Sequence, residues 1–410
     1  MRNTADKLEV PTGNRSVVAI AAFCMQLALG SVYGWSVFLN PLREVYSASK
    51  AEIGFTFTVT LAVLGITAVF GGAIQRSFGP RITATAAGLL YGAGVLFSGF
   101  APTLGMLYLT FGVVGGIGLG LGYIVPLAIL IRWFPDRRGF ITGLAVAGFG
   151  LGAFVTSPLA SELIRDVGVQ RTLMVLGAGY LLTVVLAAQF LRAAPENYAP
   201  PGWVPTQTAN LINGSDCTLT EALRSPYWYL LWLMLALNVS AGAALLSVAA
   251  PLAQEFSGVD TKAAAFLVSV IAVFNGVGRL FWGSLSDRIG RSATFFFIFV
   301  VQVITFAYMA SVSEFSALLV TVALIALCYG GGFGTMPAFA ADVFGAKHAG
   351  TIYGAMLTAW SAGAIVGPML ITSLPYRTAL LVIVGMLTMA VALPLMTGAS
   401  RRPGPSRVTA

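Results

Sequence analysis

The segment GSLSDRIGR, residues 283–291, decides the fold because of what stands on either side of it. It joins two long apolar runs, residues 261–286 and 292–312, and places three charges in a short connection. An apolar run of about 20 residues crosses a bilayer core of about 30 Å. The segment therefore predicts a short polar loop between two membrane-spanning helices.

The rest of the chain has the composition of a membrane protein. Of its 410 residues, 57% are hydrophobic and 9% are charged, whereas soluble domains carry about 25% charged residues. We therefore expect an all-α membrane protein. The apolar runs predict twelve transmembrane helices, at residues 16–39, 51–75, 81–101, 104–131, 138–163, 171–192, 226–253, 261–286, 292–312, 315–341, 349–373 and 376–397.

The longest polar stretch lies between the sixth and seventh predicted helices and is rich in proline, asparagine and serine. Such a composition is typical of a linker. We therefore expect an N-terminal six-helix bundle at 1–192, a cytoplasmic linker at 193–225 and a C-terminal six-helix bundle at 226–410.

Basic residues are distributed unevenly over the predicted loops. Sixteen Lys and Arg lie on the side of the termini, six on the other side and Arg279 within a span, which accounts for all 23. Cytoplasmic loops are the ones enriched in Lys and Arg. We therefore expect a multi-pass protein of the bacterial inner membrane with both termini cytoplasmic. The net charge of +8 follows from this topology and indicates no nucleic-acid partner.

The two halves resemble each other at a fixed offset of 211 residues. Four pairs share it: Gly72 and Gly283, Pro126 and Pro337, Gly143 and Gly354, and Gly152 and Gly363. Each pair falls at an equivalent place in the order of helices. A parallel repeat of this kind predicts two pseudo-symmetric bundles with a cavity between them.

The opening segment resembles the loop signature of the major facilitator superfamily, Gly-x-x-x-Asp-Arg-x-Gly-Arg. Asp287, Arg288 and Arg291 would then form a cytoplasmic latch that holds the halves closed in one state. The first half departs from the signature, because Arg76 stands where the family has Asp, with Arg81 after it. These five residues are the predicted latch residues.

Three further stretches narrow the resemblance to bacterial monocarboxylate transporters, which are related to oxalate/formate antiporters. They are RWFPDRRG at 132–139, YGW at 33–35, and residues 275–279 leading into FWG at 281–283. The resemblance implies a secondary active transporter of small monocarboxylates such as lactate or pyruvate. It would work by alternating access with proton coupling, and without a cofactor or metal.

Arg279 is the predicted substrate-binding cation. It lies eight residues before Asp287, which places it about 12 Å into the membrane at 1.5 Å per residue. A charge there costs about 3 kcal/mol or more, and the acidic residues all lie in termini, loops or helix ends. A buried guanidinium without a partner suits a carboxylate, because its planar fork binds both oxygens.

The remaining predicted site residues surround Arg279. Asn275 stands one helical turn before it, where related eukaryotic transporters carry an Asp, so the usual proton acceptor is missing. Trp360 stands where the oxalate/formate pattern has a Lys, and a single deep cation balances a monoanion better than a dianion. The aromatic candidates, at the middle of their spans, are Tyr33, Tyr123, Tyr329, Phe333 and Trp360.

Other functions stay open from the sequence. The main alternative is an organic-anion exchanger of the oxalate/formate type, followed by a drug or sugar facilitator and by a membrane sensor that binds without transport. His348, the single histidine, follows Lys347 in a predicted loop, and we expect it to be solvated. We also expect a monomer surrounded by lipid. No nucleophile–base pair, metal cluster or phosphate loop indicates an enzyme.

Overall fold

The computed structural model describes residues 14–195, 198–200 and 216–398, and the regular elements within them are helices. The first half contains α1 (Arg15–Leu29), η1 (Gly30–Phe38), α2 (Leu39–Tyr46), α3 (Lys50–Phe78), α4 (Pro80–Ser98), α5 (Leu104–Leu107), η2 (Tyr108–Val114), α6 (Gly115–Trp133), α7 (Arg138–Val167) and α8 (Val169–Ala188). The second half contains α9 (Leu219–Arg224), α10 (Pro226–Ser257), α11 (Thr261–Ile289), α12 (Arg291–Met309), α13 (Phe315–Phe344), α14 (Ala349–Met356), α15 (Thr358–Ser373), α16 (Tyr376–Ala390) and α17 (Ala392–Gly398).

These elements form the twelve expected spans, because several consecutive helices continue one another. Helices α1 and η1 make one span, as do α5–η2–α6, α14–α15 and α16–α17. Ten spans in the described residues are long and apolar enough to cross a bilayer by themselves, and α4 and α11 complete the set. The expected all-α fold of twelve transmembrane helices is confirmed.

The repeat predicted from glycine and proline positions extends to the ends of the helices. Ser49 caps α3 and Asp260 caps α11, each accepting a backbone N–H of the first turn, and the two residues are 211 apart. Gly79 and Gly290, also 211 apart, end the same two helices with φ of 81° and 87°. Only glycine adopts such a φ without strain, so each hairpin turns sharply into the next helix.

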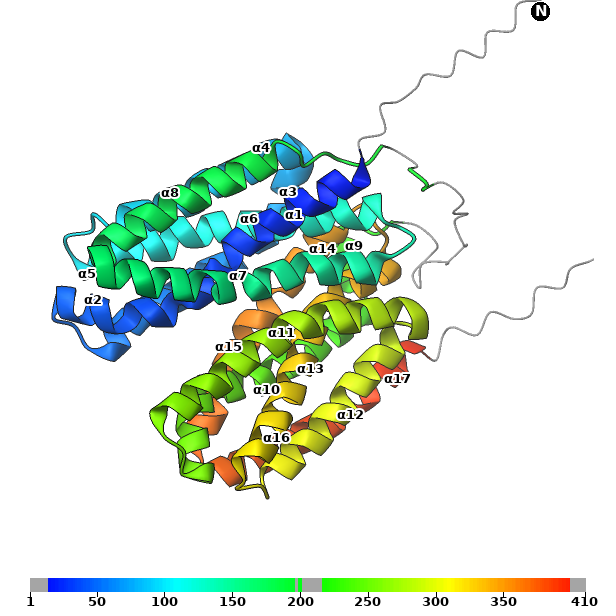
Figure 1. Ribbon diagram of the computed structural model, residues 1–410. Helices are drawn as coiled ribbons and strands as arrows, with labels where there is room; N and C mark the ends of the chain where they lie inside the picture. The colour runs from blue at the N-terminus through cyan, green and yellow to red at the C-terminus, as the bar shows by residue number, and fades with distance from the viewer. Residues whose placement is uncertain (1–13, 196–197, 201–215, 399–410) are drawn as a thin grey trace, which may run out of the picture.

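The helices form two bundles that meet along a long seam. Within the first bundle α4 packs on α8 and α3 on α6, and within the second α10 packs on α15 and α11 on α13. The bundles contact each other mainly through α7 against α11 and α3 against α14, which are equivalent pairs in the repeat. Figure 1 shows the bundles close together at the end where α1 begins and α17 ends, and apart at the other end.

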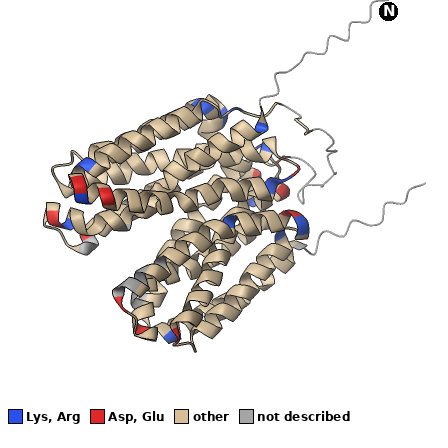
Figure 2. Ribbon diagram, in the orientation of Figure 1, with Lys and Arg blue, Asp and Glu red and all other residues tan. Residues whose placement is uncertain are grey.

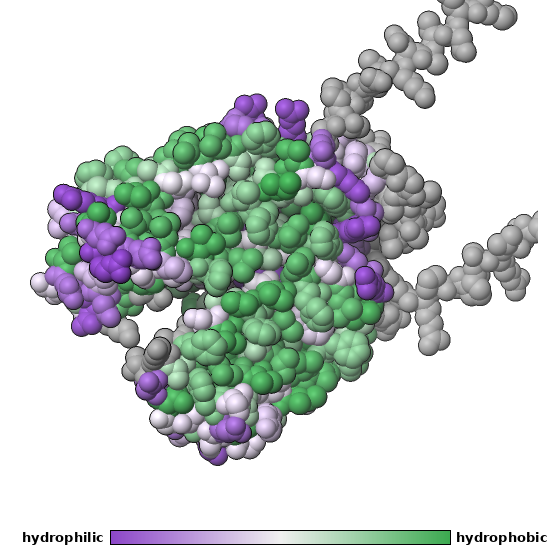
Figure 3. All heavy atoms as spheres, viewed as in Figure 1, coloured by the Kyte–Doolittle hydropathy of each residue, from purple (hydrophilic) through white to green (hydrophobic). Residues whose placement is uncertain are grey.

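Charge and hydropathy mark the two ends of the molecule. Lys and Arg gather at the end where the chain termini lie (Figure 2), which we call the terminal face. Apolar side chains cover the visible flank between the two polar ends (Figure 3). The division into 1–192, 193–225 and 226–410 stays a prediction, since most of the linker, residues 196–197 and 201–215, lies outside the described part.

Candidate functional site

Arg279 is completely buried in the middle of α11. Its Nε donates to Asn275 Oδ1 at 3.1 Å and its Nη1 donates to the Val146 carbonyl of α7 at 3.0 Å. Its Nη2 has no hydrogen-bond partner, and the guanidinium lies 5.1 Å from the centroid of the Phe333 ring. Its neighbours in the described structure thus leave the positive charge without a carboxylate.

Three buried tyrosine hydroxyls near Arg279, those of Tyr33, Tyr123 and Tyr353, make no hydrogen bond of good geometry. The Tyr33 hydroxyl lies beside Arg279, and the Tyr123 hydroxyl lies beside that of Tyr353. Each lies within electrostatic range of the guanidinium. They come from η1, α6 and α14, so both bundles contribute. A buried polar group without a partner costs about 1–3 kcal/mol. These polar groups, gathered around one point without well-formed hydrogen bonds, indicate a site for a ligand with several acceptor atoms.

Aromatic rings enclose this point, with Trp360 at their centre. Its ring centroid lies 5.0 Å from that of Phe333, 6.0 Å from Tyr123 and 6.2 Å from Tyr33. Tyr329 packs edge-on against Phe333 at 5.5 Å. The structure therefore brings together all the aromatic residues predicted from the sequence, together with Arg279 and Asn275.

A cavity of ≈ 440 Å³ leads from these rings toward the face opposite the termini. Tyr33, Tyr329 and Trp360 line its inner end, while Phe57 and Pro368 line the part nearer that face. Arg279 does not line the cavity, but Tyr33 does and also lies near the guanidinium. A ligand that enters here reaches Arg279 only when side chains such as Tyr33 and Trp360 move aside.

The 3₁₀ segment η1 positions Tyr33. A Cβ on Gly30, at its start, would lie 1.9 Å from the Phe149 carbonyl oxygen of α7, so only glycine fits at this crossing. The Tyr33 ring packs edge-on against Phe149 at 5.2 Å. Departures from regular α-helix often accompany functional sites, and this one sets Tyr33 between the cavity and Arg279.

The terminal face is closed by an ion-pair cluster between the bundles. Asp287 accepts the backbone N–H groups of Gly139 and Phe140 at 2.8 and 2.7 Å, at the start of α7. Arg291 binds Asp287 at 2.7 Å and Asp342 at 2.8 Å. Arg138 of α7 binds Asp342 from the other bundle at 2.9 Å. A carboxylate suits a helix N-terminus, which carries partial positive charge.

The other predicted latch residues lie apart from this cluster. Arg76 contacts the His348 ring of the second bundle, whereas Arg81 binds Gln189 at 2.7 Å within the first bundle. Arg288 is exposed. His348 lies in the turn before α14, as expected for a loop residue, and its partly exposed ring also contacts Arg76 of the first bundle.

Two further site residues, Tyr353 and Phe149, were not among those predicted from the sequence. Tyr353 stands seven residues before Trp360, which puts the two on one helix face, and Phe149 stands 211 residues before Trp360. Both signals are present in the sequence. Among the described residues, no group of three His, Cys, Asp or Glu could hold a metal ion.

Comparisons with known proteins agree with this architecture. The model of the Major Facilitator Superfamily matches residues 18–368 and, in a second match, 231–409. The uncharacterized MFS-type transporter YhjX of Escherichia coli K12 is 30% identical over 361 residues, which is 86% of each chain. The oxalate:formate antiporter of Oxalobacter formigenes is 28% identical over 379 residues, 90% of this chain and 88% of that one.

More distant matches add a third relative and a solved structure. Bovine monocarboxylate transporter 13 is 28% identical over 288 residues, 70% of this chain and 65% of that one. The crystal structure of the Escherichia coli fucose:proton symporter, 14% identical, superposes with a TM-score of 0.70 over 95% of this chain and 98% of that one. At that identity the structural likeness concerns the fold alone.

Proposed function

The chain belongs to the major facilitator superfamily, and we propose that it is a secondary active transporter of small monocarboxylates of the lactate and pyruvate type. It is a multi-pass membrane transporter and not an enzyme. What we propose in addition is the chemical class of the cargo, the residues that bind it and the ion that is coupled to its transport.

The proposal rests on the buried Arg279, which has no carboxylate partner among the described residues, beside three tyrosine hydroxyls that make no hydrogen bond of good geometry. A carboxylate supplies two acceptor oxygens and one negative charge, which is what this group lacks. The surrounding rings of Phe333 and Trp360 exclude water, so the ion pair forms at low dielectric and is strong. A 2-hydroxyl or 2-oxo group on the cargo would find the tyrosine hydroxyls within reach.

The transport cycle follows from the two faces. We place the terminal face in the cytoplasm of a bacterial inner membrane, because Lys and Arg gather there. The cavity then opens outward, while Asp287 and its partners close the inside. Cargo entering from outside neutralises Arg279, which lowers the cost of closing the cavity over it. The bundles then rock about the site, and the monomer suffices for this cycle.

Proton coupling requires a carrier, and Asn275 stands where a titratable Asp would serve. No Asp or Glu lines the central cavity in the described part of the chain. We therefore propose that the proton is carried through the pair of Arg279 and bound carboxylate.

Asn275 also supports Arg279, since its side-chain oxygen accepts a hydrogen bond from Arg279 Nε. Asn275→Ala removes a hydrogen bond to a charged group, which is worth about 1.5–3 kcal/mol. We expect the Kd for L-lactate to rise about tenfold or more, measured by binding to purified protein. The matched control is Asn40→Ala, an exposed asparagine of α2 outside the cavity, which leaves the Kd unchanged. An unchanged Kd in Asn275→Ala would show that Arg279 needs no such support.

The second candidate is an oxalate/formate exchanger, favoured by the likeness to the antiporter that is 28% identical. A dianion calls for a second cation, and Trp360 occupies the centre of the cage instead. Trp360→Lys is therefore expected to make oxalate compete with lactate uptake and to weaken lactate binding about tenfold or more. Trp360→Phe is the control, since it keeps the ring and adds no charge. Strong oxalate uptake by wild type would favour the exchanger.

The experiment that tests the function is uptake into proteoliposomes of purified protein. Labelled L-lactate, pyruvate, acetate and oxalate are compared, each with and without an inward proton gradient. We expect the gradient to drive accumulation of the three monocarboxylates and not of oxalate. Uptake that requires a trapped internal anion and ignores the gradient would replace symport by exchange. Binding without any uptake would indicate a sensor, and uptake of neutral sugars or drugs alone would overturn the cargo class.

A further inference from the structure

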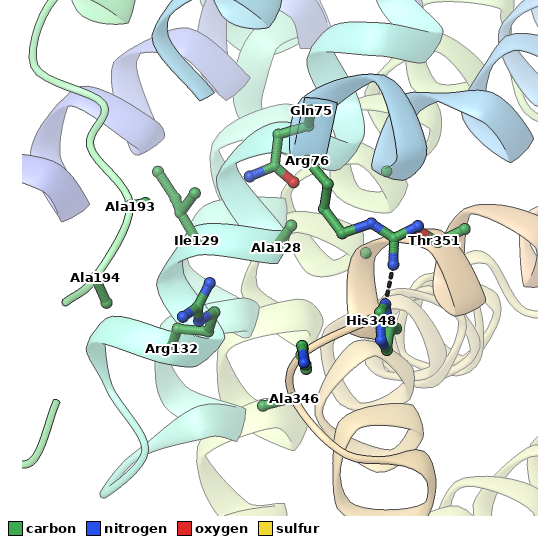
Figure 4. A pocket seen from close by; sticks show the side chains of 13 residues that line it. Gln75, Arg76, Ala128, Ile129, Arg132, Ala193, Ala194, Ala346, His348 and Thr351 are labelled. Atoms are coloured by element: carbon green, nitrogen blue, oxygen red, sulfur yellow. Dashed lines mark hydrogen bonds between the residues drawn. The ribbon is translucent and has the colours of Figure 1, made fainter. Parts of the chain in front are cut away.

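A second cavity lies at the terminal face, away from the central site (Figure 4). Arg76 and Arg132 reach it from the ends of α3 and α6, and His348 and Thr351 reach it from the start of α14, so both bundles line it. Its volume is ≈ 30 Å³, whereas one water molecule needs about 10–15 Å³. The cavity therefore has room for the oxygen atoms at one end of a small ligand.

Comparison of the two halves of the repeat shows that this cavity lacks the carboxylate found at the equivalent place in the other half. In the equivalent contact, the Asp287 carboxylate accepts two backbone N–H groups of the first turn of α7. The residue 211 positions before Asp287 is Arg76, and the equivalent first turn is that of α14, which contains Gly350 and Thr351. Both of those residues line the cavity, and no side chain caps α14. A guanidinium thus stands where the partial positive charge of a helix start favours an anion.

The titratable side chains that line this cavity are all basic. Arg76, Arg132, Lys347 and His348 line the cavity, and among the described residues no Asp or Glu does. Arg132 is half-buried and shows no hydrogen bond or ion pair to the described part of the protein. The nearby carboxylate of Asp216 accepts the Lys347 backbone N–H at 3.2 Å from outside the lining. Among the described residues, no carboxylate in the lining balances these basic groups, unlike in the ion-pair cluster around Arg291.

Thr351 supplies an independent sign of a ligand. The residue is 4% exposed, and its hydroxyl oxygen is buried without a hydrogen-bond partner. Figure 4 shows Thr351 beside the end of the Arg76 side chain, within the group of residues that line the cavity. A buried hydroxyl without a partner is rare in folded proteins. An acceptor oxygen placed in the cavity would satisfy this hydroxyl and the basic groups together.

We propose that this cavity is a binding site for a small oxyanion with phosphate chemistry, which supplies the negative charge that Asp287 supplies in the other half. The bound anion bridges α3 and α6 of the first bundle to α14 of the second. It therefore stabilises the state in which the terminal face is closed and the central cavity is open. This site is separate from the carboxylate site at Arg279 and does not depend on the identity of the cargo.

The same chemistry has two sources, namely free phosphate and the headgroup of an anionic phospholipid. Protein in nanodiscs of phosphatidylcholine, titrated with inorganic phosphate, tests the free ion. Nanodiscs that contain phosphatidylglycerol test the headgroup. The readouts are phosphate binding by calorimetry and the thermal unfolding midpoint, with sodium chloride at equal ionic strength as the control. We expect one of the two sources to raise the unfolding midpoint of the protein in a saturable way. That source is either phosphate added to protein in neutral lipid or the anionic lipid itself.

Three variants assign that effect to the cavity. Arg132→Gln removes a ligand cation and should weaken the anion affinity at least tenfold. Arg76→Asp provides the missing carboxylate within the chain, so it should raise the unfolding midpoint without phosphate and abolish the response to it. Arg279→Met, in the central site, should leave the response unchanged.

Specific outcomes overturn the proposal. One is that neither phosphate nor the anionic lipid stabilises the protein more than sodium chloride does. A second is that Arg132→Gln and Arg76→Asp respond to the anion as strongly as wild type. A third is that Arg279→Met loses the response. The last result would place the anion at the central site instead.

Discussion

Arg279→Met is expected to abolish lactate transport and, at the same time, to make the empty protein more stable. The guanidinium is fully buried and has no carboxylate among its described neighbours, and a charge at such depth costs about 3 kcal/mol or more. Methionine has a similar length and no charge, and replacing buried ions by apolar residues is often stabilising. We expect a higher thermal unfolding midpoint without substrate and a lactate affinity at least about 100-fold weaker, as for other truncated charge pairs.

The two readouts separate a binding role from a structural one. Arg165→Met is the matched control, because Arg165 is 74% exposed and pairs with Asp166 at the surface. It should change neither transport nor stability by more than about 0.5 kcal/mol. A loss of stability in Arg279→Met would mean that its bonds to Asn275 and Val146 hold the fold, and lost transport would then say nothing about the cargo. If Arg279→Met still transported lactate, Arg279 would not be the residue that binds the substrate carboxylate.

Gly283→Val is expected to open the terminal face. A Cβ on Gly283 would lie 2.5 Å from the Gly139 carbonyl oxygen and 3.1 Å from Gly143 Cα, so α7 and α11 could no longer approach as they do here. Overpacking of this kind costs about 1–3 kcal/mol, which shifts a two-state equilibrium about 5- to 150-fold. Distances between spin labels on the two bundles at the terminal face should lengthen, and those at the opposite face should shorten.

A glycine elsewhere provides the control for this shift. A Cβ on Gly179 of α8 meets nothing within 4 Å, so Gly179→Val should leave the label distances unchanged while adding the same side chain. Equal distances in Gly283→Val and wild type would show that the glycine crossing is not what closes this face. The ion pairs of Asp287 and Arg138 would then carry the closure alone.

The fold was predictable because its signals are local and repeated. Apolar runs and their polar separators predicted each span, and the 211-residue offset predicted the two bundles. The same offset recurs in the caps at Ser49 and Asp260. The buried position of Arg279 was predictable as well. It is a charged residue inside an apolar run, and the number of residues between it and Asp287 gives its depth in the membrane.

Contacts between residues far apart in the chain were not predictable from the sequence. The Val146 carbonyl that holds Arg279 lies 133 residues away, and the His348 ring meets Arg76 across 272 residues. The position of Asn275 suggested a substrate contact, whereas geometry directs its oxygen to Arg279. Arg81 fits the loop pattern of a latch residue but bonds within its own bundle. Such pairings depend on how the bundles meet, which periodicity alone does not specify.

The central claim is that the charge of Arg279 selects a carboxylate that reaches it from the outward cavity. The most direct measurement is equilibrium binding of labelled L-lactate to purified wild type and Arg279→Met, with competition by the uncharged isostere lactamide. We predict that wild type binds lactate, that lactamide does not compete, and that Arg279→Met has lost the binding. Competition by lactamide as strong as by lactate, or undiminished lactate binding in Arg279→Met, would contradict the claim.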